Sequence, residues 1–110
     1  MALIYKGKTI ATDKEGYLKN LSDWSEDIAQ LIADNDALVM SNSHWEIIHE
    51  LRAFYSEYQL SPTMRVLVKH IGSRLGKEKG SSIYLLRLFP GNPAKVAARI
   101  AGLPRPTHCL

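Results

Sequence analysis

The sequence predicts an α+β domain that is dominated by helices, and three observations lead to this prediction. Short β-prone runs separated by tight turns occupy the first 18 residues. Several segments after them repeat apolar residues at helical spacing, between recognisable helix start and stop signals. The last nine residues begin with a glycine and contain two prolines, which favour an extended arm. Because strands precede helices, we expect an α+β fold with about five helices.

The N-terminal part is predicted to be a small antiparallel β-meander that packs on the helices. Residues 3–5 and 9–12 are β-prone and flank a turn around Gly7. Residues 13–16 form a second turn, and Tyr17 and Leu18 follow it. The sequence therefore predicts three short antiparallel segments.

Two helices are expected next, and a serine can cap each of them. Ser22 precedes acidic residues that favour a first helical turn, and the helix would run to about residue 34. Ser41 or Ser43 can cap a longer helix to about residue 58. Apolar residues follow steps of three and four along both segments, so each helix should bury one face.

A third and a fourth helix follow from the same signals. Ser61 is a candidate N-cap, and Pro62 is the residue best tolerated at the first helical position. The periodic pattern continues until Gly76. After a charged loop, Ser81 or the serine beside it can begin a short helix that ends near residue 89.

The fifth helix leads into the arm. It is expected over about residues 94–101, with Gly102 as the C′ residue, and Pro104 prevents it from resuming. Pro104 and Pro106 favour a stiff, polyproline-II-like spacer. At about 3.1 Å per residue, this spacer could carry the sulfur of Cys109 roughly 20 Å from the helix. A frayed tail that happens to contain two prolines is the alternative.

Length and composition limit the organisation of the chain. With 110 residues we expect one domain, residues 1–102, and a flexible arm, residues 103–110. No apolar run approaches the roughly 18 residues of a membrane span, and no signal peptide is evident, so we expect a cytoplasmic protein that needs no membrane. The single cysteine excludes an internal disulfide. We expect a monomer when free, and no cofactor.

Charge is divided unevenly along the chain. Residues 1–60 carry five Lys or Arg and ten Asp or Glu, whereas residues 61–110 carry nine Lys or Arg and only Glu78. A basic half that bears the arm suits an acidic protein surface or RNA near the thiol. The alternative is that the two halves neutralise each other across the fold.

Cys109 is the candidate catalytic residue, because a thiol near a chain end gains little from packing and is accessible to another protein. Its reactivity depends on the thiolate fraction. Arg105 and a protonated His108 would favour the thiolate, while the carboxylate of Leu110 would oppose it. The net sign stays open, and so does the alternative of a surface cysteine without a function.

Other chemistries are less well supported by the sequence. His44 and His49 are five residues apart, so they do not share the helical face that paired metal ligands use. Trp24 and Trp45, at helical spacing, favour core positions over stacking platforms. The segment around residues 59–62, followed by a basic helix, resembles a helix-turn-helix, so a nucleic-acid-binding module stays an alternative.

The C-terminal segment from Ile100 to Leu110 closely resembles the end of the DsrC/TusE family, in which the penultimate cysteine is the working residue. Further matches occur at 44–46, at 51–55 and at 85–91, so the resemblance covers most of the chain from about Gly16. It implies a DsrC-like domain with a reactive arm. Members that serve dissimilatory sulfite reductase carry a second cysteine eleven positions earlier, where this chain has Ala98.

This departure makes the chain most similar to the TusE branch, the sulfur carriers of tRNA 2-thiouridine synthesis. The resemblance implies a sulfurtransferase in which Cys109 accepts a persulfide sulfur from a TusBCD-like complex and passes it to an MnmA-like tRNA thiolase. Direct contact with tRNA is an open possibility. Pro104, Arg105, Pro106 and His108 would serve partner docking or tuning of the thiolate. A single-cysteine γ-type subunit of sulfite reductase is the remaining alternative.

Overall fold

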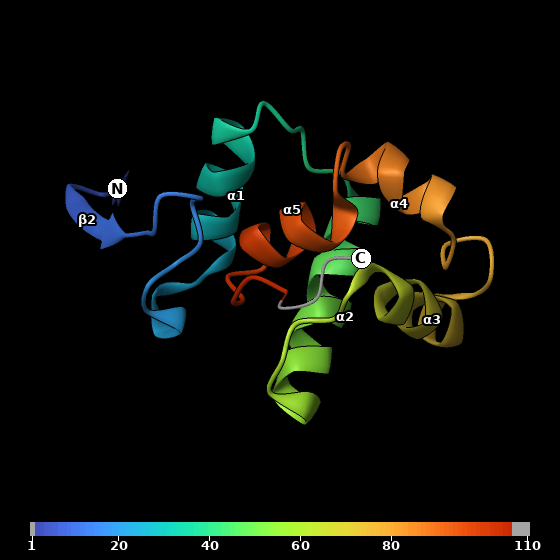
Figure 1. The fold of residues 1–110 in the computed structure, drawn as a ribbon. Coiled ribbons are helices and arrows are strands. Elements are labelled where there is room, and N and C mark those ends of the chain that lie inside the picture. The colour runs from blue at the N-terminus through green and yellow to red at the C-terminus, as the bar shows by residue number, and fades with distance from the viewer. Residues whose placement is uncertain (1, 107–110) are drawn as a thin grey trace.

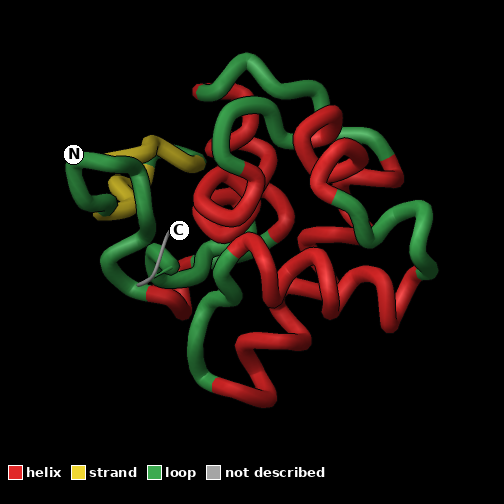
Figure 2. Tube along the Cα trace, turned by 45° about the vertical axis from the view of Figure 1, so that its right-hand side comes forward, coloured by secondary structure: helices red, strands yellow, loops and turns green. Residues whose placement is uncertain are grey.

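The computed structural model describes residues 2–106 and shows a two-stranded hairpin beside a group of five helices (Figure 1). Figure 2 shows that the strands lie at one edge and that helices make up most of the rest. The elements are β1 (Ala2–Tyr5), β2 (Lys8–Ala11), the 3₁₀ turn η1 (Leu21–Asp23), α1 (Glu26–Asn35), α2 (Asn42–Tyr58), α3 (Met64–Leu75), α4 (Ser82–Leu88) and α5 (Pro93–Ile100). The expected mostly helical α+β class is confirmed.

The β-hairpin forms where the sequence places it. Leu3 pairs with Ile10 in an antiparallel register, and Lys6 and Gly7 take positive φ values of 50° and 77° in the tight turn. Ile10 is buried against the helices, which fixes the face of the hairpin that meets the core. The third segment of the expected meander contributes one isolated bridge, between Thr12 and Leu18.

The first helix begins later than the sequence predicts. Asn20 accepts the backbone N–H of Ser22 and caps η1, so Ser22 is not the N-cap of α1. Ser25 accepts the N–H of Ile28 and starts α1 at Glu26. Ser22 and Ser25 both precede acidic residues, so both fit the local signal for an N-cap. Because Asn20 caps η1 and places Ser22 inside it, Ser25 is the N-cap of α1. Trp24 therefore lies between two helical segments and not on a helical face.

The second and fourth helices start at predicted serines. Ser41 caps α2, and the ring of His44 accepts the backbone N–H of Ser41 in return. Ser81 caps α4 through the N–H of Tyr84. The Nε2 of buried His44 lies 2.7 Å from the carbonyl oxygen of Leu88, which ties the end of α4 to the start of α2. These caps keep α4 attached to the body although it is only seven residues long.

The predicted start of the third helix is wrong by two residues. Thr63 is the N-cap, and α3 begins at Met64, while Ser61 and Pro62 are buried in the connection from α2. The hydroxyl of Ser61 donates to the carbonyl oxygen of Pro104 and does not cap the helix. The predicted end of α3 at Gly76 is confirmed.

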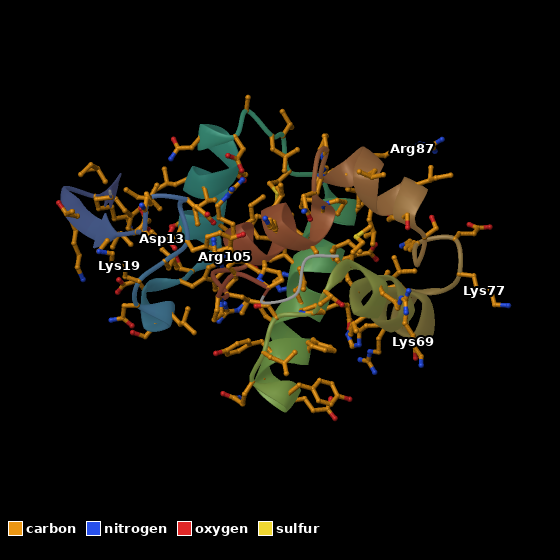
Figure 3. The ribbon with its side chains drawn as sticks, in the orientation of Figure 1. Asp13, Lys19, Lys69, Lys77, Arg87 and Arg105 are labelled. Atoms are coloured by element: carbon orange, nitrogen blue, oxygen red, sulfur yellow. The ribbon has the colours of Figure 1, made fainter. Side chains whose placement is uncertain are left out.

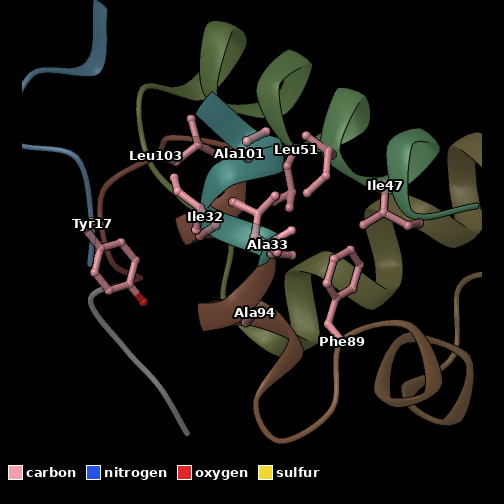
Figure 4. Close-up of a cluster of buried hydrophobic side chains, with 14 of the residues drawn as sticks. Tyr17, Ile32, Ala33, Ile47, Leu51, Phe89, Ala94, Ala101 and Leu103 are labelled. Carbon is pink, nitrogen blue, oxygen red and sulfur yellow. The ribbon is translucent and has the colours of Figure 1, made fainter. Parts of the chain in front are cut away.

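The last helix, α5, is the centre of the fold and lies among the other four (Figure 1). Asn92 caps it and Pro93 occupies its first position, both favoured there. Ala94, Ala97 and Ala98 are buried, and their small side chains allow neighbouring helices to approach closely. Core side chains from α1 and α2 and Phe89 pack around this helix (Figure 4). The arm therefore starts from the most buried helix of the molecule.

Candidate functional site

The arm begins at a helix end that the backbone closes by itself. Gly102 has a φ of +72°, and its N–H donates to the carbonyl oxygen of Arg99. The N–H of Leu103 donates to the carbonyl oxygen of Ala98. These two bonds make the Schellman arrangement that commonly ends helices. Leu103 is buried, so the chain turns sharply and remains in contact with the core.

Two side chains from distant parts of the sequence bind the remaining carbonyl groups of this helix end. The indole Nε1 of Trp24 donates to the carbonyl oxygen of Ile100 at 2.8 Å. Arg52 of α2 donates to the carbonyl oxygen of Ala101 at 2.6 Å, and its guanidinium lies 3.8 Å from the centre of the Trp24 ring. A cation near a helix C-terminus and over an aromatic face is stabilised twice. Burial lowers the pKa of the Arg52 guanidinium.

Gly102 fits this arrangement because it has no side chain. A Cβ at this position would lie 2.2 Å from Cδ1 of Trp24, closer than any real carbon contact. We call Trp24, Arg52 and Gly102 the arm clamp. It fixes both the direction and the starting point of the arm.

The next residues of the arm are held on both sides. The hydroxyl of Ser61 donates to the carbonyl oxygen of Pro104. One guanidinium nitrogen of Arg105, Nη1, donates to both carboxylate oxygens of Glu15, at 2.7 and 2.8 Å. Pro106 is buried. The contacts thus follow the chain residue by residue from Gly102 to Pro106, which we call the arm base.

The structure places three of the predicted site residues on this base. Pro104 and Pro106 are held against the body, and Arg105 directs its charge to Glu15 in the turn after the hairpin, near the centre of the view in Figure 3. Cys109 and His108 lie outside the described residues. The catalytic role of Cys109, and the docking or tuning roles of the others, stay predictions. The flexibility of residues 103–110 also stays a prediction.

Pro106 borders a hollow of about 320 Å³ between the starts of three helices. Met64 of α3, Leu86 of α4, and Pro93 and Ala94 of α5 contribute apolar side chains to its wall. The lining residues are Thr63, Met64, Ser82, Leu86, Gly91, Asn92, Pro93, Ala94 and Pro106. The last described residue of the arm therefore lies at the edge of a concave surface.

Several residues of the site were missed by sequence reasoning. Glu15, Ser61 and Trp24 contact the end of α5 or the arm base from positions that are 43 to 90 residues away in the sequence. Only Arg52 gave a local signal, because it is a cation that directly follows the core residue Leu51 on an amphipathic helix. Such a cation at the edge of a core needs a buried partner, and here the partners are a carbonyl group and an indole ring.

Within residues 2–106, no group of three or more His, Asp or Glu side chains is arranged to hold a metal ion. None of the helices in this part of the chain combines the length and the apolar character needed to cross a membrane.

Comparison with known proteins agrees with this fold. A model of the "DsrC like protein" family matches residues 4–110. The sulfurtransferase TusE of Escherichia coli (strain K12) is 52% identical over 108 residues, which cover 98% of this chain and 99% of that protein. The fold and the family match define the class, a small, mostly helical DsrC-like domain. The chain belongs to the DsrC-like family.

Two solved structures of this family have the same architecture. Allochromatium vinosum DsrC has a TM-score of 0.90 and 51% identity, and the match covers 99% of this chain and 97% of that one. The oxidized γ-subunit of the dissimilatory sulfite reductase, DsrC, from Archaeoglobus fulgidus has a TM-score of 0.87 and 36% identity, with both chains fully covered. The predicted family is confirmed. The predicted class of activity, a sulfurtransferase in a sulfur relay, is confirmed by the TusE relatives.

Proposed function

We propose that Cys109 carries sulfur as a persulfide in the cytoplasm, accepting it from a TusBCD-like complex and passing it to an MnmA-like thiolase for 2-thiolation of the tRNA wobble uridine. The observation that carries this proposal is the arm base. It holds the chain up to Pro106 and leaves the only thiol of the sequence three residues further on. The likeness to TusE proteins over nearly the whole chain supports the same role.

The proposed step is a thiol exchange without net oxidation or reduction. The Cys109 thiolate attacks the outer sulfur of a partner's cysteine persulfide, and a new S–S bond forms at Cys109. The S–S bond in the partner breaks, and the partner's thiolate leaves with the electron pair. A thiolate of the second partner then attacks the outer sulfur of the Cys109 persulfide in the same way. Access and the acidity of the leaving thiol govern both steps.

The arm base sets the reach of this chemistry. Three fully extended residues span at most about 11 Å, so Cys109 stays within that distance of Pro106 while the base is intact. The partner's cysteine must therefore approach the body of the protein closely. Positioning in the partner's site would supply much of the rate. Arg105 can contact an acidic rim of a partner only after it leaves Glu15, which would lengthen the arm.

The test is a measurement of intact mass after incubation with the purified TusBCD-like complex loaded with persulfide, followed by alkylation. We expect the wild-type protein to gain one sulfur atom and Cys109→Ser to gain none. Wild-type protein whose mass shows the alkyl group but no additional sulfur atom would refute the proposal.

A γ-type role beside sulfite reductase is the second candidate, and the likeness to the Archaeoglobus protein favours it. Ala98 is fully buried on α5, and this chain has no second cysteine with which Cys109 could form an internal disulfide. Co-purification with a sulfite reductase, and no sulfur gain from the TusBCD-like complex, would favour this candidate.

A nucleic-acid-binding role remains the third candidate, because Arg65 and Lys69 are exposed on α3 after the connection from α2. Gel shifts on duplex DNA and on tRNA at rising salt would test it, since phosphate contacts lose affinity steeply with salt. Binding that is unaffected by Cys109→Ser would support this role.

A further inference from the structure

The hollow beside Pro106 is a candidate docking surface next to the reactive arm. We propose that it receives a large apolar side chain from an acidic segment of the protein that donates sulfur to Cys109. This inference rests on the proposed function and names the surface by which the donor is recognised. Size, surface character, charge and position each support it.

The hollow has the size and lining for an apolar anchor. Its volume of about 320 Å³ is roughly twice that of an engineered cavity that binds benzene, about 150 Å³. Met64, Leu86, Pro93 and Ala94 supply apolar wall from three helices. Protein interfaces commonly gain most of their affinity from a few large side chains seated in such pockets.

Apolar side chains continue from the hollow onto the surface around it. Leu86 lines the hollow and is 42% exposed, and Ile83, which directly follows the lining residue Ser82 on α4, is 66% exposed. This combination of a pocket and an exposed apolar margin is typical of a protein partner. A nucleic acid would gain little from it, because its backbone is recognised by charge.

The charges around the hollow select an acidic partner. Between residues 61 and 106 the only carboxylate is Glu78. Arg65, Arg87 and Lys95 each follow a lining residue directly in the sequence, and none of them forms an ion pair with another residue in the range 2–106. Figure 3 shows Arg87 and Lys69 projecting outward from α4 and α3. The N-terminal ends of α3 and α5 add positive potential at the wall.

Position links the hollow to the chemistry. Pro106 belongs to both the arm base and the wall of the hollow, so a partner bound there lies within three residues of Cys109. Binding at the hollow would raise the effective concentration of the partner's persulfide at the thiol.

The test is a titration of the Cys109→Ser protein with the purified TusBCD-like complex, in which no sulfur can be transferred. Leu86→Glu in this background places a carboxylate in the wall and should weaken binding at least about tenfold, since like charges repel an acidic partner. Val39→Glu is the matched control, because Val39 is 86% exposed between α1 and α2 and does not line the hollow. The affinity of Val39→Glu for the complex should equal that of the Cys109→Ser parent.

A second pair of variants separates local charge from overall charge. Arg87→Glu should weaken binding more than Lys77→Glu, which makes the same charge change in the loop after α3. Equal affinity of Leu86→Glu and its parent, equal effects of the two charge reversals, or no binding by the parent would each overturn the docking proposal. A faster alkylation of Cys109 in free Leu86→Glu that retains its cysteine would also overturn the docking proposal, since the chain's own residues 107–110 would then be the occupant.

If Leu86→Glu lost binding to tRNA but kept its affinity for the TusBCD-like complex, the docking proposal would be overturned as well. The mass measurement on wild-type protein tests the proposed function separately. Sulfur gain by wild type together with unchanged binding of Leu86→Glu refutes docking alone, whereas absence of sulfur gain refutes the relay.

Discussion

At Gly102 the backbone turns from α5 into the arm, and two independent requirements favour glycine there. The φ of +72° is costly for residues with a Cβ, and the Trp24 ring occupies the space that the Cβ would need. The sequence predicts the first requirement, because a glycine followed two residues later by a proline is typical of a helix end. It does not reveal the second, since Trp24 lies 78 positions earlier.

Replacing Gly102 by alanine should therefore destabilise the protein by more than backbone strain alone. We expect a loss of roughly 3 kcal/mol in the free energy of unfolding, as left-handed strain of about 1–2 kcal/mol adds to overpacking against Trp24. Urea unfolding monitored by circular dichroism measures it.

Gly91→Ala is the control for strain without a clash. Gly91 has a φ of +94°, but a Cβ there would meet nothing within 4 Å. It should lose only about 1 kcal/mol. Equal losses for the two variants would show that Trp24 moves aside easily and that the arm clamp is loose.

At the scale of elements, the ends of helices show what the sequence can and cannot predict. Ser41 and Ser81 cap α2 and α4 as predicted, because a capping serine needs only neighbours within its own turn. Ser61 and Pro62 have the same local signal, yet the helix starts after them. The hydroxyl of Ser61 is used by Pro104, 43 residues later, and this tertiary bond overrides the local preference.

Ser61→Ala should reveal the strength of this bond. The carbonyl oxygen of Pro104 would lose its donor at a partly buried position, which should lower the unfolding free energy by about 1–2 kcal/mol. Thermal or urea unfolding measures the change. Ser56→Ala, at an exposed site of α2, is the control and should leave stability unchanged or slightly higher. A neutral Ser61→Ala would mean that water replaces the hydroxyl and that the arm base is held by its other contacts.

At the scale of the whole molecule, the two halves of opposite charge meet through ion pairs. In the part of the chain that the structure describes, Arg74, Lys79, Arg99 and Arg105 pair with Glu50, Glu46, Asp36 and Glu15. Each pair joins a cation from the basic half to a carboxylate from the acidic half. Neutralisation across the fold is thus partial, because Arg65 and Lys69 on α3, Arg87 on α4 and Lys95 at the start of α5 form no ion pair with another residue in the range 2–106.

The unneutralised cations predict a salt-dependent encounter with the sulfur donor. Raising the ionic strength from about 0.1 to 1 M shortens the screening length from about 10 to 3 Å, so kcat/KM for sulfur transfer from the protein donor should fall several-fold. Rates measured by intact mass at a series of salt concentrations provide the test. Persulfide formation from a small uncharged donor should not change. A flat salt profile with the protein donor would show that charge plays no part in recognition.

The arm clamp has a consequence for how such sequences can vary. Trp24, Arg52 and Gly102 come from three separate segments, yet the indole plane supports the guanidinium and fills the space above the glycine. A homologous chain with a side chain at position 102 would need a smaller residue at position 24. Without the indole, an arginine at position 52 would lose the surface on which it stacks. These three positions should therefore change together during evolution, although no two of them are neighbours in the sequence.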